Sequence, residues 1–122
     1  MSASTLPDQT ADELVSACRT SAGDRLRSVT HFTSEGYDQL YLRDDLEQDA
    51  DLEAWVTAER DGFASREAYD GSELGGYEFT IRAFEHGYVT RVITGDRGVF
   101  VTTDRMSLTR FEDVASAVAP LL

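Results

Sequence analysis

The sequence contains no lysine and no asparagine, and it has few of the residues that build metal or disulfide sites. Its single cysteine cannot form a disulfide framework, and one cysteine with two histidines does not supply the ligand spacing of a zinc site. No apolar run approaches the roughly 18 residues that a membrane span needs. We therefore expect neither a disulfide-rich secreted domain, nor a metal site, nor a membrane-spanning protein.

Lysine is missing from a chain that is strongly acidic. The 122 residues include 23 Asp and Glu against 11 basic residues, all of them Arg, which gives a formal net charge of −12. An acidic surface without the strongly hydrated Lys side chain stays soluble when salt screens charges to about 3 Å at 1 M, so we favour a salt-adapted cytoplasm. A high genomic G+C content would also favour Arg over Lys, and composition does not separate these two explanations.

The acidic residues are spread along the chain instead of forming a stripe, and this bears on partners. A mimic of nucleic acid needs a charged stripe, and direct nucleic-acid binding needs a basic patch that releases counterions; the sequence offers neither. The first residues show no basic segment followed by an apolar one, so no secretion signal is expected. We expect a cytoplasmic protein with no nucleic-acid or membrane partner.

The order of predicted elements indicates the α+β class. Residues 1–9 predict a frayed N-terminal tail, followed by one domain over residues 10–122. Thr10 and Glu13 have capping-box spacing at the start of a helix that Gly23 ends. The remaining predicted elements are strands at 26–33 and 37–43, a helix from 52, strands at 77–85, 88–94 and 99–103, and a helix from 108. The order α-β-β-α-β-β-β-α predicts a single domain with a five-stranded, largely antiparallel sheet flanked by helices.

The hairpin between the third and fourth strands is the most informative segment. A two-residue loop at His86 and Gly87, with positive φ at both positions, would set Arg82 opposite Arg91. Alternation then divides the last three strands into two faces. One face, predicted to be core, carries Phe79, Ile81, Ala83, Val92, Val99 and Val101; the other carries Phe84, Val89, Ile93 and Phe100 with Arg82 and Arg91.

Two arginines directly opposite one another repel unless an acid or an anion lies between them. Glu78, on the same strand as Arg82, is a candidate partner. One interpretation is that a helix covers this face while the guanidinium groups reach acidic residues. The other is a docking surface, for a second copy of the chain or for an anionic ligand, because aromatic residues and Arg are enriched in interface cores.

Few residues suggest catalysis. His31 lies on the first strand, with Tyr37, Gln39 and Tyr41 as expected cross-strand neighbours, and is either a buried strand histidine or a proton relay. Cys18 is expected to be a small buried residue on a helix face. The glycines show no phosphate-loop pattern, and the acidic residues lack the spacing of a calcium loop. We expect no catalytic residue, no metal and no cofactor.

Three segments carry a resemblance to a known family. The runs Leu40–Leu46, Gly76–Tyr88 and Gly98–Asp104 resemble an uncharacterised family of small acidic proteins from haloarchaea, a domain of unknown function. The resemblance spans nearly the whole chain after the N-terminal tail. That family has no assigned activity, so the resemblance implies no catalytic residue.

The element order carries a second resemblance, which is architectural only. It is similar to that of the roadblock/LC7 modules of the profilin-like group, in which helices flank a five-stranded sheet. That resemblance implies a module of which two copies pair to regulate small GTPases or to scaffold complexes.

These observations favour a non-catalytic interaction or regulatory module that homodimerises through its central helix and the adjoining sheet. The alternative is a small-ligand sensor that holds an anion between Arg82 and Arg91, and a third hypothesis is an enzyme that uses His31 and a tyrosine. The candidate ligand or interface residues are Arg82, Arg91, Phe84, Val89, Ile93, Phe100 and His31.

Overall fold

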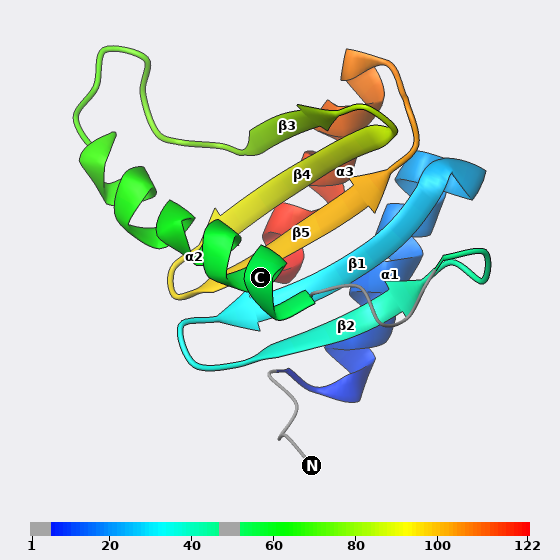
Figure 1. Cartoon of the computed structure of the whole chain (residues 1–122). Coiled ribbons are helices and arrows are strands. Elements are labelled where there is room, and N and C mark those ends of the chain that lie inside the picture. Colours follow the sequence, from blue (N-terminus) through cyan, green and yellow to red (C-terminus); the bar gives the residue numbers. More distant parts are fainter. Residues whose placement is uncertain (1–5, 47–51) are drawn as a thin grey trace.

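An antiparallel five-stranded sheet separates two layers of helices in the computed structural model, which describes residues 6–46 and 52–122 (Figure 1). The elements are α1 (Asp8–Ala22), β1 (Leu26–Thr33), β2 (Tyr37–Leu42), α2 (Leu52–Ala68), β3 (Thr80–Phe84), β4 (Gly87–Thr94), β5 (Arg97–Thr103) and α3 (Leu108–Val118), with short 3-10 turns after α1 and α3. The strands lie in the order β2-β1-β5-β4-β3. The expected α+β class and the order α-β-β-α-β-β-β-α are confirmed.

The sheet has an apolar cluster on each face. Helices α1 and α3 lie behind the sheet in Figure 1, and α2 crosses its near face. The cluster under α1 and α3 includes Leu14, Cys18, Val29, Val92, Val99, Val101, Val114 and Val118. The cluster under α2 includes Phe32, Val56, Val89, Ile93 and Phe100. The division of the last three strands into two faces is therefore as the alternation predicts.

The N-terminal helix begins earlier than expected. It starts at Asp8 after Pro7 without a side-chain cap, so the predicted capping box of Thr10 and Glu13 is wrong. The fixed φ of Pro7 suits a helix start, and the Asp8 carboxylate in the first turn suits the helix dipole. Leu6 of the predicted frayed tail is buried, Pro7 is exposed, and Asp8 and Gln9 already belong to α1; residues 1–5 lie outside the described ones.

A bulge changes which residues of β2 face the core. Tyr41 lies opposite Val29 and Gln39 opposite Thr30, which leaves Leu40 as an extra residue. Leu40 and Tyr41 therefore both pack against the α1/α3 cluster. Strict alternation, which predicts Tyr41 on the same face as Gln39, is wrong at this point.

Helix α2 is held close to the sheet by a glycine and an arginine. A Cβ atom at Gly62 would overlap the guanidinium group of Arg91 and lie 2.7 Å from Ile93 Cδ1, so only glycine permits this approach. Arg60 Nε donates to the Thr33 carbonyl at 2.8 Å, which fixes α2 to the β1–β2 turn. The helix thereby presents Glu59, one turn before Gly62, to the sheet.

Candidate functional site

The β3–β4 hairpin differs in register from the sequence-based expectation. Thr80 lies opposite Arg91 and Arg82 opposite Val89, so the predicted pairing of Arg82 with Arg91 is wrong. The loop consists of Glu85 and His86, and the positive φ values of the described residues occur only at glycines 23, 71, 75 and 95.

Gly87 has a different use from the one expected. It begins β4, where an added Cβ atom would overlap the carbonyl oxygen of Thr103. The glycine is needed for the close approach of β5 and not for a turn with positive φ. The hairpin register shifts by two residues as a result, and a shift of two leaves each side chain on its expected face.

Arg82 and Arg91 nevertheless meet, because one carboxylate lies between them. Arg91 Nη1 lies 3.1 Å from Glu59 Oε1, and Arg82 Nε lies 3.3 Å from Glu59 Oε2. The acid that separates the two arginines is therefore Glu59 of α2 and not the expected Glu78. The Glu59 and Arg91 side chains are 3% and 5% exposed, whereas that of Arg82 is 47% exposed. This is the arrangement of the covered-face interpretation, with a helix over the sheet and an acid between the guanidinium groups.

Further hydrogen bonds fix the Arg91 guanidinium group. Its Nη2 donates to Thr80 Oγ1 at 2.9 Å and to the Tyr77 hydroxyl at 3.4 Å, and those two hydroxyl groups lie 2.6 Å apart. Its buried Nε has no hydrogen-bond partner among residues 6–46 and 52–122. Burying two charges is costly unless they are paired and hydrogen-bonded, and these contacts supply most of that compensation. The cluster therefore fixes α2 to β3 and β4.

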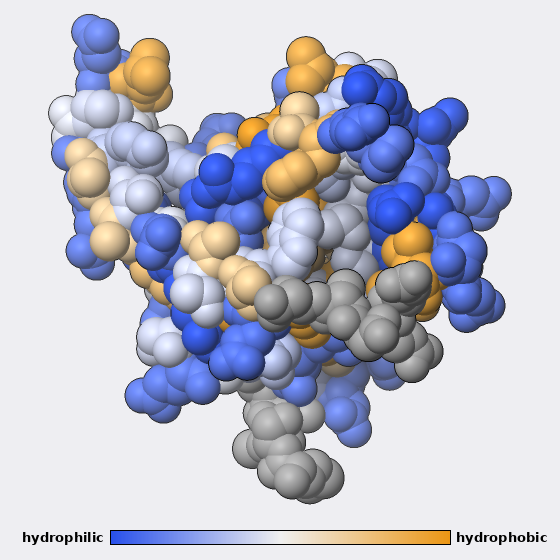
Figure 2. Space-filling model, in the orientation of Figure 1, coloured by the Kyte–Doolittle hydropathy of each residue, from blue (hydrophilic) through white to orange (hydrophobic). Residues whose placement is uncertain are grey.

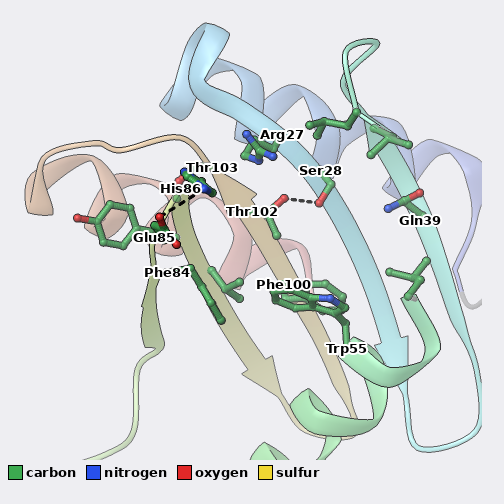
Figure 3. A pocket seen from close by; sticks show the side chains of 16 residues that line it. Arg27, Ser28, Gln39, Trp55, Phe84, Glu85, His86, Phe100, Thr102 and Thr103 are labelled. Carbon is green, nitrogen blue, oxygen red and sulfur yellow. Dashed lines mark hydrogen bonds and ion pairs between the residues drawn. The ribbon is translucent and has the colours of Figure 1, made fainter. Parts of the chain in front are cut away.

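Beside α2, the same face of the sheet carries an apolar groove of about 480 Å³ (Figure 3). Trp55 of α2 forms one wall, with its ring centroid 5.3 Å from that of Phe84 and 6.4 Å from that of Phe100. The polar groups of the floor include Ser28 Oγ and Thr102 Oγ1, which are 2.5 Å apart. The other apolar side chains that line the groove include Leu42, Leu46, Leu52 and Val89. Figure 2 shows apolar residues reaching the surface on this face among strongly hydrophilic ones.

A network of ion pairs borders the groove. Arg27, which lines it, lies 2.9 Å from Asp104 Oδ1, and Arg43 lies 2.8 Å from Asp104 Oδ2 and 2.6 Å from Asp45 Oδ1. The hydrogen bond from Arg43 holds the pKa of Asp104 below its usual range, and the hydrogen bond from Arg27 adds to this. Both arginines are thus neutralised by their acidic neighbours.

The predicted site residues fall into three groups. Phe84, Val89 and Phe100 line the groove; Ile93 packs under α2; Arg82 and Arg91 meet at Glu59. The structure therefore brings six of the seven candidates to one face of the sheet.

His31 is fully buried and lies apart from these residues. It is opposite Asp38 and Val99 in the sheet, and not opposite the expected Tyr37, Gln39 or Tyr41. It alternates with Phe32 and so points to the α1/α3 side, away from the groove. Burial lowers the pKa of His31 below its ordinary value, and the charge of Arg97 lowers it further, against an opposing effect of Asp38.

Two other residues considered for chemistry are accounted for by their surroundings. The buried Cys18 thiol has its pKa raised to about 12 by burial, so it remains protonated at neutral pH. His86 is exposed in the hairpin loop. Within the described residues, no group of three or more His, Cys, Asp and Glu side chains could hold a metal ion, and no helix is long and apolar enough to cross a membrane.

The sequence places Glu59 and Trp55 in the repeating stripe of the central helix but does not connect either residue with the candidate site. Glu59 stands three residues after Val56 and four before Phe63, inside the apolar stripe of α2. A carboxylate at such a position is a signal of a buried ion pair, because an acid is almost never fully buried without a partner. The groove has no comparable signal, since it depends on how far α2 extends across the sheet.

Comparison with known proteins identifies the family. The family described as "Domain of unknown function (DUF7522)" matches residues 12–122. The chain belongs to this family. The expected membership of an uncharacterised family is thereby confirmed, and the matched range spans every strand and all but the first turn of α1. No curated protein matches the sequence.

Solved structures identify the fold of this family member. The gliding protein MglB of Thermus thermophilus superimposes with a TM-score of 0.67 at 14% identity, over 98% of this chain and 95% of that one. An MglB with a tetrameric arrangement gives 0.66 at 13% identity, over 99% and 96%. A roadblock/LC7 domain from Streptomyces avermitilis gives 0.56 at 13% identity, over 92% and 91%. The fold is therefore that of the roadblock/LC7 modules, as the element order suggests.

Proposed function

We propose that this protein is a non-catalytic regulatory module that pairs with a second copy of itself through β3 and the outer side of α2. The observation that carries the proposal is the position of β3 at the edge of the sheet, where it pairs with β4 alone among the described strands. An edge strand presents unpaired backbone groups, and proteins usually protect such edges with charged residues, proline or a bulge. β3 has the regular register Thr80–Phe84 against β4 and one charged residue, Arg82, which is turned toward Glu59.

The outer side of α2 supports the same interface. Four exposed positions at helical spacing carry short side chains: Thr57, Asp61, Ala64 and Ala68. Short side chains allow a helix from another molecule to approach closely, at interaxial distances of about 8–10 Å. Self-association through this surface agrees with the tetrameric arrangement of one MglB, and the roadblock/LC7 resemblance implies pairing of two copies to regulate small GTPases or scaffold complexes.

The buried polar groups support a role without catalysis. The Glu59 carboxylate occupies the position between Arg82 and Arg91 at which the anion-sensor hypothesis places its ligand. His31 lies inside the sheet's other layer, and the Cys18 thiol is protonated at neutral pH. These groups hold the fold together, which favours an interaction module over a sensor or an enzyme. The acidic, lysine-free composition supports a salt-adapted cytoplasm as the place where the module works.

Sedimentation equilibrium in multimolar KCl tests the self-association. We expect a dimer at micromolar concentration, and we expect Ala64→Glu to be monomeric because its longer, charged side chain, beside Asp61, prevents the close approach of a second helix. Ser116→Glu is the matched control: it adds the same charge at an exposed position of α3, on the opposite side of the sheet, and should remain dimeric. A wild-type protein that is monomeric at high micromolar concentration would show that the proposal is wrong.

A further inference from the structure

The two faces of the sheet are covered unequally. Five strands spaced about 4.8 Å apart make a sheet about 20 Å wide, and a helix with its side chains is about 10 Å across, so full cover needs two helices. Helices α1 and α3 provide two on one face, whereas α2 is the one helix on the other among residues 6–46 and 52–122 (Figure 1). The groove lies on that face beside α2, between Trp55 and the start of β4.

The floor of the groove excludes a strand as its occupant. It is formed by residues of β1, β5 and β4, and each of these strands pairs with a neighbour on both sides. Their backbone donors and acceptors are already used in the sheet, so an added strand would bury unpaired backbone groups. An occupant of this groove must satisfy its own backbone, and a helix does so.

The charge around the groove defines the polar side of the occupant. Arg27 and Arg43 border the groove and are paired with Asp104 or Asp45, and Arg105 donates to the hydroxyl of Tyr88, which lines it. Glu85 lines the groove itself. Two further acids stand next to lining residues in the sequence: Asp44 lies between Leu42 and Leu46, and Glu53 follows Leu52. Three arginines against five acids leave a negative border around an apolar floor.

We propose that the groove binds an amphipathic helix of another protein, with apolar side chains toward Trp55, Phe84 and Phe100 and arginine or lysine toward the acidic border. Trp55 and Phe84 are large aromatic residues that remain 37% and 46% exposed, as anchoring positions of a helix-binding groove do. A second copy of this chain is a poorer occupant, because a lysine-free acidic chain offers few cations for the acidic border of the groove. Trp55 and Phe84 belong to α2 and β3, the elements of the proposed self-association, so peptide binding is measured on the Ala64→Glu variant as well as on the wild-type protein.

Trp55 makes the proposal directly measurable, because it is the single tryptophan of the chain and forms a wall of the groove. The probe is a synthetic peptide of about 18 residues, long enough to form a helix in water, with leucine at i, i+3, i+4 and i+7 and arginine elsewhere. We expect saturable binding with a blue shift of the Trp55 emission, weakened but not abolished at high salt. A peptide of the same pattern with glutamate in place of arginine, and a scrambled peptide of the same composition, should bind at least about tenfold more weakly.

Variants connect the binding to the groove. Phe84→Ala keeps the Trp55 reporter and should weaken binding by about tenfold or more, the usual effect of truncating an aromatic anchor. Leu108→Ala is the matched control, an exposed apolar residue outside the groove that should leave affinity unchanged. Thermal unfolding of both variants separates loss of the groove from loss of the fold.

Three results would overturn the proposal. The first is absence of binding, or equal binding by the glutamate peptide or by the Phe84→Ala variant. The second is a Trp55 emission that shifts with protein concentration and blocks the peptide, which would assign the groove to a second copy. The third is binding of a small apolar dye such as N-phenylnaphthylamine, lost in Phe84→Ala, without any binding of the peptide. Repeating the peptide titration on the Ala64→Glu variant, which is expected to be monomeric, shows whether peptide binding depends on self-association.

Discussion

Replacing Glu59 by glutamine tests whether one carboxylate holds the two arginines and α2 together. The substitution preserves the shape of the side chain but removes its charge, so Arg91, whose side chain is 5% exposed, keeps a buried charge without a counter-ion. Breaking a buried pair in this way costs about 3–5 kcal/mol, and because the amide oxygen can still accept a bond from Arg91 Nη1 we expect about 3 kcal/mol. That is a large part of the 5–15 kcal/mol by which a typical domain is stable.

The contribution of the second arginine should be small. Arg82 is 47% exposed and lies 3.3 Å from Glu59, so its guanidinium group can turn to solvent when the carboxylate is lost. Exposed ion pairs contribute about 0–1 kcal/mol, and Arg82→Gln should cost no more than that. The free energy of unfolding is measured for both variants by denaturant titration at constant KCl concentration.

A double substitution separates the cost of a broken pair from the value of the intact one. In Glu59→Leu/Arg91→Met both charges are absent, and the two hydroxyl groups that Arg91 contacts still have one another at 2.6 Å. Replacing a buried ion pair by apolar residues of similar size is often neutral or stabilising, so we expect the double variant to be more stable than Glu59→Gln. A cost below about 1 kcal/mol for Glu59→Gln, equal to that of Arg82→Gln, would refute the argument that Arg91 is a buried charge held by this carboxylate.

Three further predictions concern the packing and the buried titratable groups. Gly62→Ala should destabilise the protein by about 1–3 kcal/mol in denaturant titration through overlap with Arg91, although alanine favours an exposed helix by about 1 kcal/mol. Ala58→Gly, the reverse change at an exposed position of α2 outside the proposed interface, should cost about 1 kcal/mol, and a stabilising Gly62→Ala would contradict the close approach. Because burial lowers the pKa of His31, the unfolded chain binds more protons, so this residue should make stability fall as pH drops through the unfolded pKa near 6.5. In His31→Phe the slope of unfolding free energy against pH should be smaller near pH 6.5 by the contribution of this residue. Cys18, with a pKa of about 12, should resist alkylation by iodoacetamide at neutral pH in the folded protein and react only on unfolding, whereas rapid native-state alkylation would contradict its burial.

The sequence predicts the two faces of the sheet but not the register of its central hairpin. Alternation over Val89, Ile93 and Phe100 identifies the face that α2 covers, because a strand repeats every two residues whatever its partner does. The register was wrong because Gly87 has two possible uses, in a turn with positive φ or in a close approach to another strand, and only the fold shows that Thr103 lies against it. Because the register differs by two residues, both arginines remain on the expected face, where they contact the same carboxylate of Glu59.

The groove could not be predicted because it depends on coverage, which is a property of distances between elements. The sequence of each strand that lines the groove is that of an ordinary half-buried strand, and Trp55 occupies a helical position that a core residue would also occupy. What leaves the groove open is that α2 lies close to the sheet at Gly62 and crosses only part of its face. A sequence pattern reports which side of an element is apolar, and it does not report how much of that side a neighbour reaches.

Several arginines of this lysine-free chain donate to two acceptors at once. Arg110 contacts two carbonyls at the end of α1, with Nη2 at 2.9 Å from Ala22 and Nε at 3.4 Å from Ser21. Arg60 likewise donates to the carbonyls of Thr33 and Gly36, and Arg43 joins Asp104 and Asp45. A guanidinium group can donate to two acceptors at a fixed spacing, which the point charge of an ammonium group does not. These arginines are therefore committed to joining elements of the fold, a use that the forked guanidinium group suits and an ammonium group does not.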